Sequence, residues 1–222
     1  MTLDTASNTS SNSTTSQADP LMPVTARGQA TRRKLLNAAE MEFGNKGFHV
    51  SSVSSITGRA GVGQGTFYLY FRTKEEIFVT LVQEIGRNLR GKMQAALQAP
   101  GERSSRERAA LQTFFDFSVS NRAHFRIVQE AQFVDEAVFR DYNEQIAADY
   151  AQSLEDNSEG QSAAERDPQV RAWGLLGMGH FVGLRRYLCT ASDPSRQDFD
   201  SMMSLIKHQA PSQSAQGVAA PV

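Results

Sequence analysis

Cysteine is nearly absent from this sequence, and Cys189 alone cannot form an intrachain disulfide. A single thiol fits a reducing compartment, so we expect a cytoplasmic protein. The four histidines are scattered without the spacing of metal ligands. No nucleophile motif, glycine-rich phosphate loop or pair of catalytic carboxylates stands out either. We therefore expect no catalytic site, no metal and no cofactor.

Long apolar runs are also missing. Hydrophobic residues make up 40% of the 222 positions, and no segment approaches the ~20 apolar residues of a membrane-spanning helix, so we expect no membrane partner. Residues 1–25 are rich in Ser, Thr and Asn and lack the basic start and apolar core of a secretion signal, which predicts a disordered leader. Residues 210–222 are rich in Ala, Ser, Gln and Pro and are expected to form a disordered tail.

The charge is unevenly distributed. The net charge of −1 would argue against nucleic acid, yet residues 26–75 carry eight Lys or Arg against three Asp or Glu. The remainder carries 15 against 21. A basic segment joined to an acidic one suits a DNA-binding head on a larger body, and chance clustering on a solvated surface is the alternative.

Apolar residues recur at helical spacing along the chain, and the alternation typical of strands is absent. The sequence therefore predicts an all-α fold of about nine helices. The expected helices span 29–46, Ser51 or Ser52 to Ala60, 64–70, Thr73 to just before Pro100, 104–120, 122–131, 134–156, 168–190 and 195–209.

Residues 51–74 are the most informative segment. They form two short predicted helices joined by the turn Gly61-Val62-Gly63, where Gly61 is free to adopt a positive φ and Val62 can anchor the turn in the core. Thr73 and Glu76 have capping-box spacing at the start of a long fourth helix. This layout is typical of a helix-turn-helix, whose second helix lies in the DNA major groove.

The stretch 56–77, ITGRAGVGQGTFYLYFRTKEEI, has the pattern Ala-Gly-Val, a small turn, Gly-Thr-aromatic-Tyr, and a terminal Phe followed by Lys-Glu. In this pattern the chain resembles the TetR family of bacterial transcriptional regulators, most strongly over about 29–80. The resemblance implies a helix-turn-helix DNA-binding domain at 26–73 and a ligand-binding and dimerisation domain at 74–209. It also implies repression, the usual action of the family.

Several residues of the head are candidate DNA contacts. Gln64 can pair bidentately with adenine, and Thr66 can offer its hydroxyl to a base or phosphate and its methyl group to thymine. In the family, the positions of Tyr68 and Tyr70 commonly contact DNA, and Lys74 resembles a phosphate-binding lysine. Plain core packing is the alternative for the aromatic cluster. The predicted DNA contacts are Arg32, Ser52, Ser54, Gln64, Gly65, Thr66, Tyr68, Tyr70 and Lys74.

A homodimer on a near-palindromic operator is expected, because one recognition helix reads too few base pairs. In TetR-like proteins the last two helices usually form the dimer interface. Here segment 168–190 is apolar nearly all round, and its glycines permit close approach of a partner. A core helix of the same chain explains the pattern as well. The predicted interface residues are Leu176, Gly179, Val182, Gly183, Met202 and Ile206.

The resemblance further implies an effector pocket between the fourth and eighth helices. Segments 125–135 and 177–186 are similar to TetR-like regulators of fatty-acid or aryl-acid catabolism that sense acyl-coenzyme A, for which an apolar tunnel and arginines are suitable. A generic sensor of hydrophobic drugs or metabolites is the second interpretation, and an effector-independent DNA-binding structural protein is the third. The candidate pocket residues, each of which core packing also explains, are Phe114, Phe117, Arg122, Phe125, Arg126, Phe133, Tyr142, Trp173 and His180.

Overall fold

A computed structural model describes residues 23, 25–154, 167–189 and 196–207, so nearly all of the predicted leader and all of the predicted tail lie outside it. Within these residues every regular element is an α-helix, which confirms the all-α class. In chain order the helices are α1 (Ala26–Lys46), α2 (Val53–Ala60), α3 (Gln64–Phe67), α4 (Lys74–Leu97), α5 (Arg103–Ser120), α6 (Arg122–Val134), α7 (Glu136–Leu154), α8 (Pro168–Cys189) and α9 (Arg196–Lys207).

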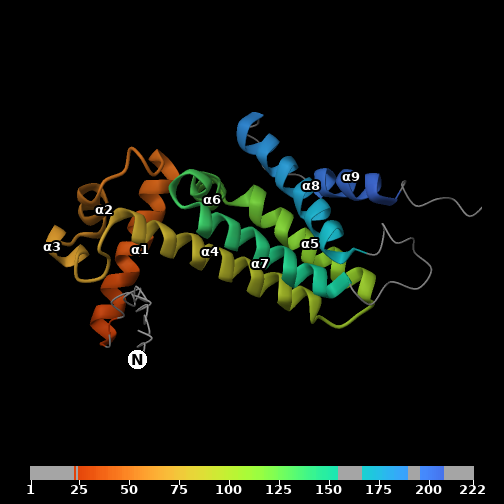
Figure 1. Cartoon of the computed structure of the whole chain (residues 1–222), viewed down its shortest axis with the longest axis horizontal. Helices are drawn as coiled ribbons and strands as arrows, with labels where there is room; N and C mark the ends of the chain where they lie inside the picture. The colour runs from red at the N-terminus through yellow and green to blue at the C-terminus, as the bar shows by residue number, and fades with distance from the viewer. Residues whose placement is uncertain (1–22, 24, 155–166, 190–195, 208–222) are drawn as a thin grey trace, which may run out of the picture.

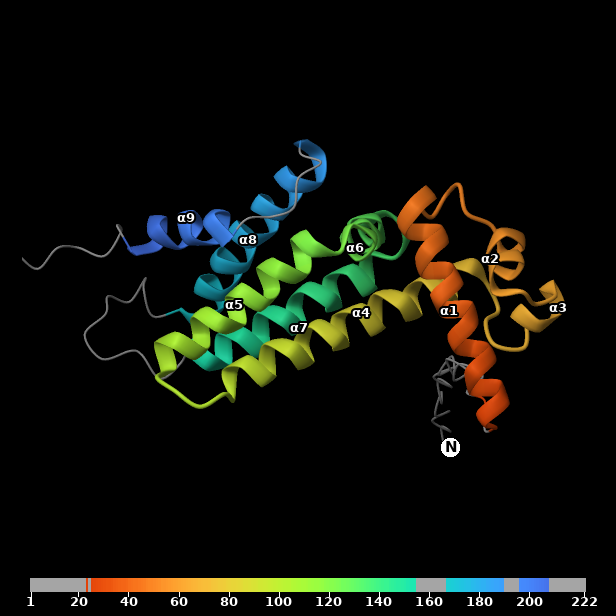
Figure 2. The same ribbon diagram turned by 180° about the vertical axis from the view of Figure 1, so that it is seen from behind.

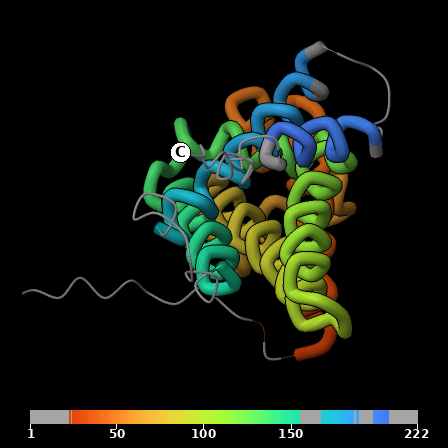
Figure 3. The backbone as a smooth tube through the Cα atoms, turned by 90° about the vertical axis from the view of Figure 1, so that its right-hand side faces the viewer, coloured from red at the N-terminus to blue at the C-terminus, as the bar shows by residue number. Residues whose placement is uncertain are grey.

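The molecule is elongated, with a small head at one end of a longer helical body (Figure 1). Helices α1–α3 form the head, and α4 runs from the head along the body beside α5 and α7 (Figure 2). Helix α8 crosses α5 and α7, and α9 lies against α8 (Figure 3). Helix α6 lies where the head meets the body and packs on α1 as well as on α4, α5 and α7.

Hydroxyl side chains set where the first two helices begin. Helix α1 starts three residues before its predicted beginning, because the Thr25 hydroxyl accepts a hydrogen bond from the Gly28 amide at 3.1 Å. Of the two serines at which the second helix was predicted to begin, Ser52 is the one that caps α2. Its hydroxyl accepts from the Ser55 amide, and the Ser55 hydroxyl accepts in turn from the Ser52 amide, both at 3.1 Å.

Helix α3 is shorter than predicted. It ends at Phe67, whose carbonyl accepts hydrogen bonds from the amides of both Tyr70 and Phe71, so a turn replaces the last residues of the expected helix. Helix α4 begins as predicted, with the Thr73 hydroxyl accepting from the Glu76 amide at 3.1 Å. The later helices agree with prediction within three residues over the described segments.

Two apolar clusters form the core. The second lies wholly in the body, between α4, α5, α7, α8 and α9. The first begins in the head with Phe43, Ile56 and Phe67 and continues through α4 to Ile127 and Val128 of α6. The predicted domain boundary at residue 73 therefore does not separate two cores, since head and body share one buried cluster.

Candidate nucleic-acid interface and effector cavity

The turn between α2 and α3 has the conformation that its glycine predicts. Gly61 adopts φ 68° and ψ 35°, the left-handed region that ordinary residues rarely enter. The Val62 amide then donates to the Thr57 carbonyl at 3.1 Å, and the Val62 side chain packs against the first core cluster. This turn fixes how α3 projects from α2.

The outer face of α3 is open. Gln64 and Gly65 are exposed and Thr66 is half-buried, and no atom lies within 4 Å of the position that a Cβ at Gly65 would occupy. In the turn that follows, Tyr68 is 53% exposed, and Leu69 is exposed as well. A side-chain amide, bare backbone, a phenol and an apolar side chain are thus presented together, and all are suited to base edges or phosphates.

Lys74 and Tyr70 are held against the head. The Lys74 ammonium donates to the carbonyls of Phe48 and Ser51, each at 2.9 Å, and lies 4.2 Å from the centroid of the Phe48 ring. One of its three N–H groups remains for a phosphate. Tyr70 is half-buried against the first core cluster. Both residues therefore shape the head, whatever contacts they make to DNA.

Arg32 faces inward rather than toward an outer surface. Its side chain is only 13% exposed, and its Nη1 lies 3.6 Å from Oε1 of Glu84 on α4. Its guanidinium carbon lies 5.2 Å from the centroid of the Phe71 ring. Arg33, which is more exposed, forms a 3.0 Å ion pair with the same carboxylate. The predicted DNA contact Arg32 thus braces α1 against α4.

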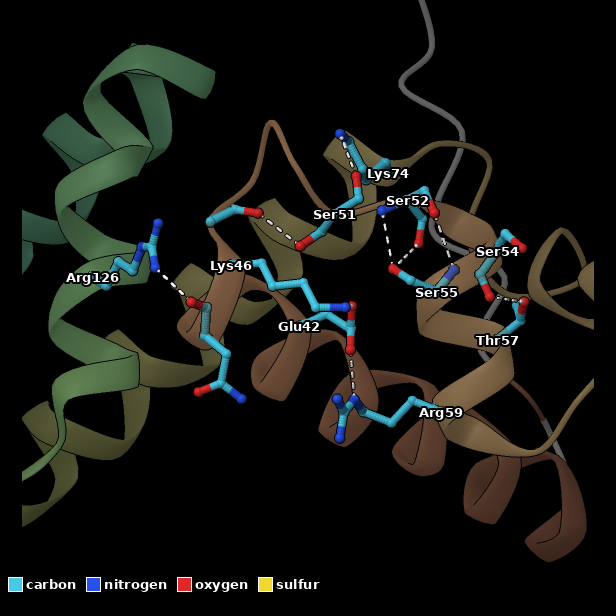
Figure 4. Close-up of polar contacts among 12 residues, drawn as sticks. Glu42, Lys46, Ser51, Ser52, Ser54, Ser55, Thr57, Arg59, Lys74 and Arg126 are labelled. Atoms are coloured by element: carbon cyan, nitrogen blue, oxygen red, sulfur yellow. Dashed lines mark hydrogen bonds and ion pairs between the residues drawn. The ribbon is translucent and has the colours of Figure 1, made fainter.

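The two predicted serine contacts at the start of α2 are exposed. The Ser52 hydroxyl is engaged as the helix cap. The Ser54 carbonyl accepts from the Thr57 hydroxyl at 3.2 Å (Figure 4). Because the cap uses the Ser52 hydroxyl as an acceptor, its O–H can still donate to a phosphate.

A buried carboxylate ties α1 to α2. The Glu42 side chain is 2% exposed, and its two oxygens form 2.7 Å ion pairs with Lys46 and with Arg59 of α2 (Figure 4). The hydrogen bond from Lys46, assisted by that from Arg59, holds the pKa of Glu42 at about 2 against the opposing effect of burial. The carboxylate is therefore ionised across the neutral range.

The body contains a cavity of about 410 Å³ between α5, α7 and α8. Most of its lining is apolar, with a few polar groups, which is the usual character of a small-molecule site. The lining residues are Phe114, Glu136, Phe139, Arg140, Asn143, Ile146, Trp173, Leu176, Gly177 and His180.

His180 is the most enclosed titratable group of this lining. Burial lowers its pKa, so the imidazole is neutral near pH 7. Its Nε2 lies 3.2 Å from the Gln129 amide nitrogen of α6, and its ring centroid lies 5.5 Å from that of Phe125. Arg140, which is exposed, supplies a cation among the lining residues.

One face of α8 carries apolar side chains that the rest of the described chain leaves uncovered. Val170, Phe181 and Leu188 follow one another at helical spacing and are exposed, Phe181 to 70%. Leu205 of α9 is exposed as well. Both helices lie on the outside of the body (Figure 1). We call Val170, Phe181 and Leu188 the outer apolar face.

Residues 35–81, from the middle of α1 into α4, match the family described as "Bacterial regulatory proteins, tetR family". The chain is also 31% identical over 179 residues to the "Uncharacterized HTH-type transcriptional regulator YdgC" of Bacillus subtilis (strain 168), an alignment that covers 77% of this chain and 88% of the relative. The chain belongs to the TetR family.

One further relative supports this placement, and one solved structure shares the fold. The "HTH-type transcriptional activator FasR" of Mycolicibacterium smegmatis is 32% identical over 105 residues, 47% of this chain and 48% of the relative. The structure of the "fatty acid degradation regulator FadR from Bacillus halodurans" superposes with a TM-score of 0.65 at 18% identity, covering 79% of this chain and 94% of that one. As a TetR-family member, the chain is a DNA-binding transcriptional regulator and not an enzyme.

Two features are absent from the residues that the structure describes. None of their helices combines the length and apolar character that crossing a membrane requires. They also contain no group of three His, Cys, Asp or Glu side chains placed to hold a metal ion.

In the structure of this TetR-family body, the predicted pocket residues lie in three different places. Phe114, Trp173 and His180 line the cavity, whereas Tyr142 lines a separate groove between α4 and α7. The other five lie away from the cavity lining, and their predicted placement is corrected. Phe117 stacks on His124, Arg122 contacts Tyr187, and Phe125 packs on His180. Arg126 donates to the Asn45 carbonyl in the last turn of α1, and Phe133 is 78% exposed.

Most of the predicted interface residues pack within their own chain. Leu176 and Met202 are buried in the second core cluster of their own chain, and Val182 packs against it. A Cβ at Gly179 would lie 3.3 Å from the Phe114 ring, and one at Gly183 would lie 3.2 Å from Ser118, so these glycines admit α5 of the same chain. The side chain of Ile206 lies outside the described residues.

Sequence reasoning missed the α7 wall of the cavity. Glu136, Phe139, Arg140, Asn143 and Ile146 recur at helical spacing on one face of α7, a signal that the sequence does contain. Only Tyr142 of α7 was predicted to line the pocket, and it lies in the separate groove between α4 and α7. Leu69 in the head was missed as well.

We expect an acid-sensitive head because of Glu42. Its pKa lies below the ordinary value of 4.5, so the ionised form contributes stability above about pH 4.5 that is lost as the pH falls toward about 2. Urea unfolding from pH 6 to pH 2.5 should show a steeper loss of unfolding free energy in the wild type than in Glu42→Gln.

The control is Glu144→Gln, which removes an exposed carboxylate of α7. Its pH profile should match that of the wild type. Equal acid slopes for wild type and Glu42→Gln would contradict the assigned ion pairs.

Proposed function

We propose that the chain is a repressor that binds a near-palindromic operator as a homodimer and releases it when a hydrophobic effector, of the acyl-coenzyme A type, enters the body. The observation that carries the DNA part is the open outer face of α3, within a segment that matches the TetR family. The cavity beside α8 supports the effector part. The outer apolar face supports the dimer.

Gln64 is the side chain that we expect to read a base. It is exposed at the first position of α3, next to the bare backbone of Gly65. An amide paired bidentately with adenine contributes about 1–3 kcal/mol of discrimination. Gln64→Ala should therefore weaken binding to the preferred operator by about that amount and relax the choice of base at one position in each half-site.

The measurement is fluorescence anisotropy on labelled duplexes selected by the protein from a random library. The matched control is Gln98→Ala, which changes an exposed glutamine at the far end of α4. Unchanged base preference in Gln64→Ala would remove Gln64 from the reading face.

The outer apolar face, and the operator symmetry that a short recognition helix needs, support the proposed dimer. A charge at Phe181 should split the dimer. We expect Phe181→Glu to sediment as a monomer at micromolar concentration and to bind the operator about a hundredfold more weakly, since two linked heads bind far more tightly than one.

The control for this experiment is Phe133→Glu, which places the same charge on an equally exposed phenylalanine of α6. It should remain dimeric. A dimeric Phe181→Glu protein would show that the subunits associate elsewhere.

The acyl-coenzyme A assignment combines the apolar cavity with the FadR structure, described as a fatty acid degradation regulator. Because Arg122 and Arg126 are engaged elsewhere, Arg140 is the cation that we assign to the acidic end of the effector. The acyl chain would lie against Ile146 and Leu176.

Palmitoyl-coenzyme A should dissociate the labelled operator complex, while free coenzyme A should not. Gly177→Leu should reduce this response at least tenfold with unchanged DNA affinity, because the position lines the cavity and faces open space. Gly91→Leu, at an exposed glycine of α4, is the control.

Other outcomes identify the alternatives. Release by unrelated hydrophobic compounds but not by the thioester indicates a generic sensor. Tighter operator binding with the thioester would replace the proposed mode by ligand-assisted binding. No response to any compound would leave an effector-independent DNA-binding protein.

A further inference from the structure

The cavity between α5, α7 and α8 carries few polar side chains. Of the titratable residues that line it, Glu136 and Arg140 are exposed, whereas His180 is half-buried. Asn143 is half-buried as well, and its amide nitrogen donates to the Phe139 carbonyl at 2.8 Å. His180 is therefore the titratable group that the enclosed part of an effector meets.

Three neighbours hold the imidazole of His180 in place. The ring of Phe125, which is itself buried, has its centroid 5.5 Å from that of the imidazole, and the Phe181 ring lies edge-on at 6.0 Å. The side-chain amide nitrogen of Gln129 lies 3.2 Å from Nε2 of the imidazole. The ring is thus fixed with Nε2 toward Gln129.

The contact with Gln129 decides which ring nitrogen carries the proton. An amide nitrogen can only donate, so Nε2 of His180 accepts, and the proton of the neutral ring is on Nδ1. Burial lowers the pKa of His180, so the ring is neutral near pH 7. A protonated imidazole would also set two donors against each other at the Gln129 contact.

The N–H group at Nδ1 is available to a ligand, because Nδ1 of His180 makes no hydrogen bond within the part of the chain that the structure describes. A neutral donor brings no charge to balance a carboxylate, and burying an unpaired carboxylate is costly. An uncharged carbonyl oxygen needs only the hydrogen bond. The chemistry of this wall therefore favours a carbonyl group over an acid.

We propose that Nδ1–H of His180 donates a hydrogen bond to an uncharged carbonyl oxygen beside the acyl chain of the effector, as a thioester or ester provides, and that Gln129 is the positioning residue that fixes this tautomer. This inference rests on the proposed function, since it concerns the effector of the same cavity. It makes His180 the residue by which the cavity selects a thioester over the corresponding free acid.

The tautomer can be measured without any ligand. In ¹⁵N-resolved NMR spectra of the full-length protein at pH 7, the His180 ring should be neutral with its proton on Nδ1, and His180→Phe identifies its signals. Gln129→Leu should lose this tautomer preference. Gln132→Leu, at an exposed glutamine of the same helix, is the matched control and should keep it. A wild-type proton on Nε2 would contradict the assigned donor.

Trp173 reports ligand binding without DNA, because it is the single tryptophan of the sequence and lines the cavity. The two probes are palmitoyl-coenzyme A and S-hexadecyl-coenzyme A, a thioether of the same chain length that lacks the carbonyl. The wild type should bind the thioester about tenfold more tightly, since the thioether leaves the buried donor unpaired.

The variants assign this discrimination to one side chain. His180→Phe should bind the two probes with equal affinity, and His180→Asn, whose amide nitrogen can replace Nδ1, should restore part of the preference. His49→Phe changes an exposed histidine of the α1–α2 loop and should keep the full preference.

Each outcome has a separate meaning. Equal wild-type affinities for thioester and thioether, or tighter binding of free palmitate than of the thioester, overturn the role of His180. Absence of binding by either coenzyme A probe overturns both this role and the acyl-coenzyme A assignment. Binding of the thioester beside Trp173 without release of the operator defeats the proposed function and leaves the His180 contact standing.

Discussion

The contact on which the rest of the head depends is a cluster of three phenylalanines from α1, the α1–α2 loop and α4. The ring centroids of Phe43 and Phe78 are 5.3 Å apart, and those of Phe48 and Phe78 are 4.9 Å apart, both edge to face. Such pairs contribute about 0.5–1.5 kcal/mol each beyond the area that they bury. The cluster fixes the loop on α4, and Lys74 covers it. The positions of α2 and α3, which follow this loop in the chain, depend on that anchoring.

This cluster belongs to a core that extends into α6, so the head is not an independent unit. Ile127, Val128 and Ala131 of α6 are buried with the phenylalanines of the head. The polar contacts of Arg126 and Glu130 surround that apolar contact. A regulator built this way can alter its DNA-binding end by shifting one buried interface, because close-packed cores change arrangement rather than deform gradually.

The sequence predicted what local signals determine. The helix starts at Thr73 and Ser52 and the turn at Gly61 need only a hydroxyl or a glycine at one position, and the helix-turn-helix followed from them. The cavity was predicted only in part because it depends on which face of each helix packs inward. Helix α8 is apolar on several faces, so Leu176 could be assigned to a partner although it lies in the core. No local sequence signal distinguishes an apolar residue that packs in its own core from one that packs on a partner subunit.

Charge was the least reliable predictor of DNA contacts, because most cations of the basic head form contacts within the fold. Lys46 and Arg59 share Glu42, Arg32 and Arg33 share Glu84, and Lys74 bonds to carbonyls. Arg27, Lys34 and Arg72 are the remaining exposed cations of the eight. A head with so few uncommitted charges relies less on phosphate attraction than its composition suggests. Sequence is read at base edges rather than at phosphates, so in the proposed function the DNA preference rests on α3 and on the contacts that hold α3 in place.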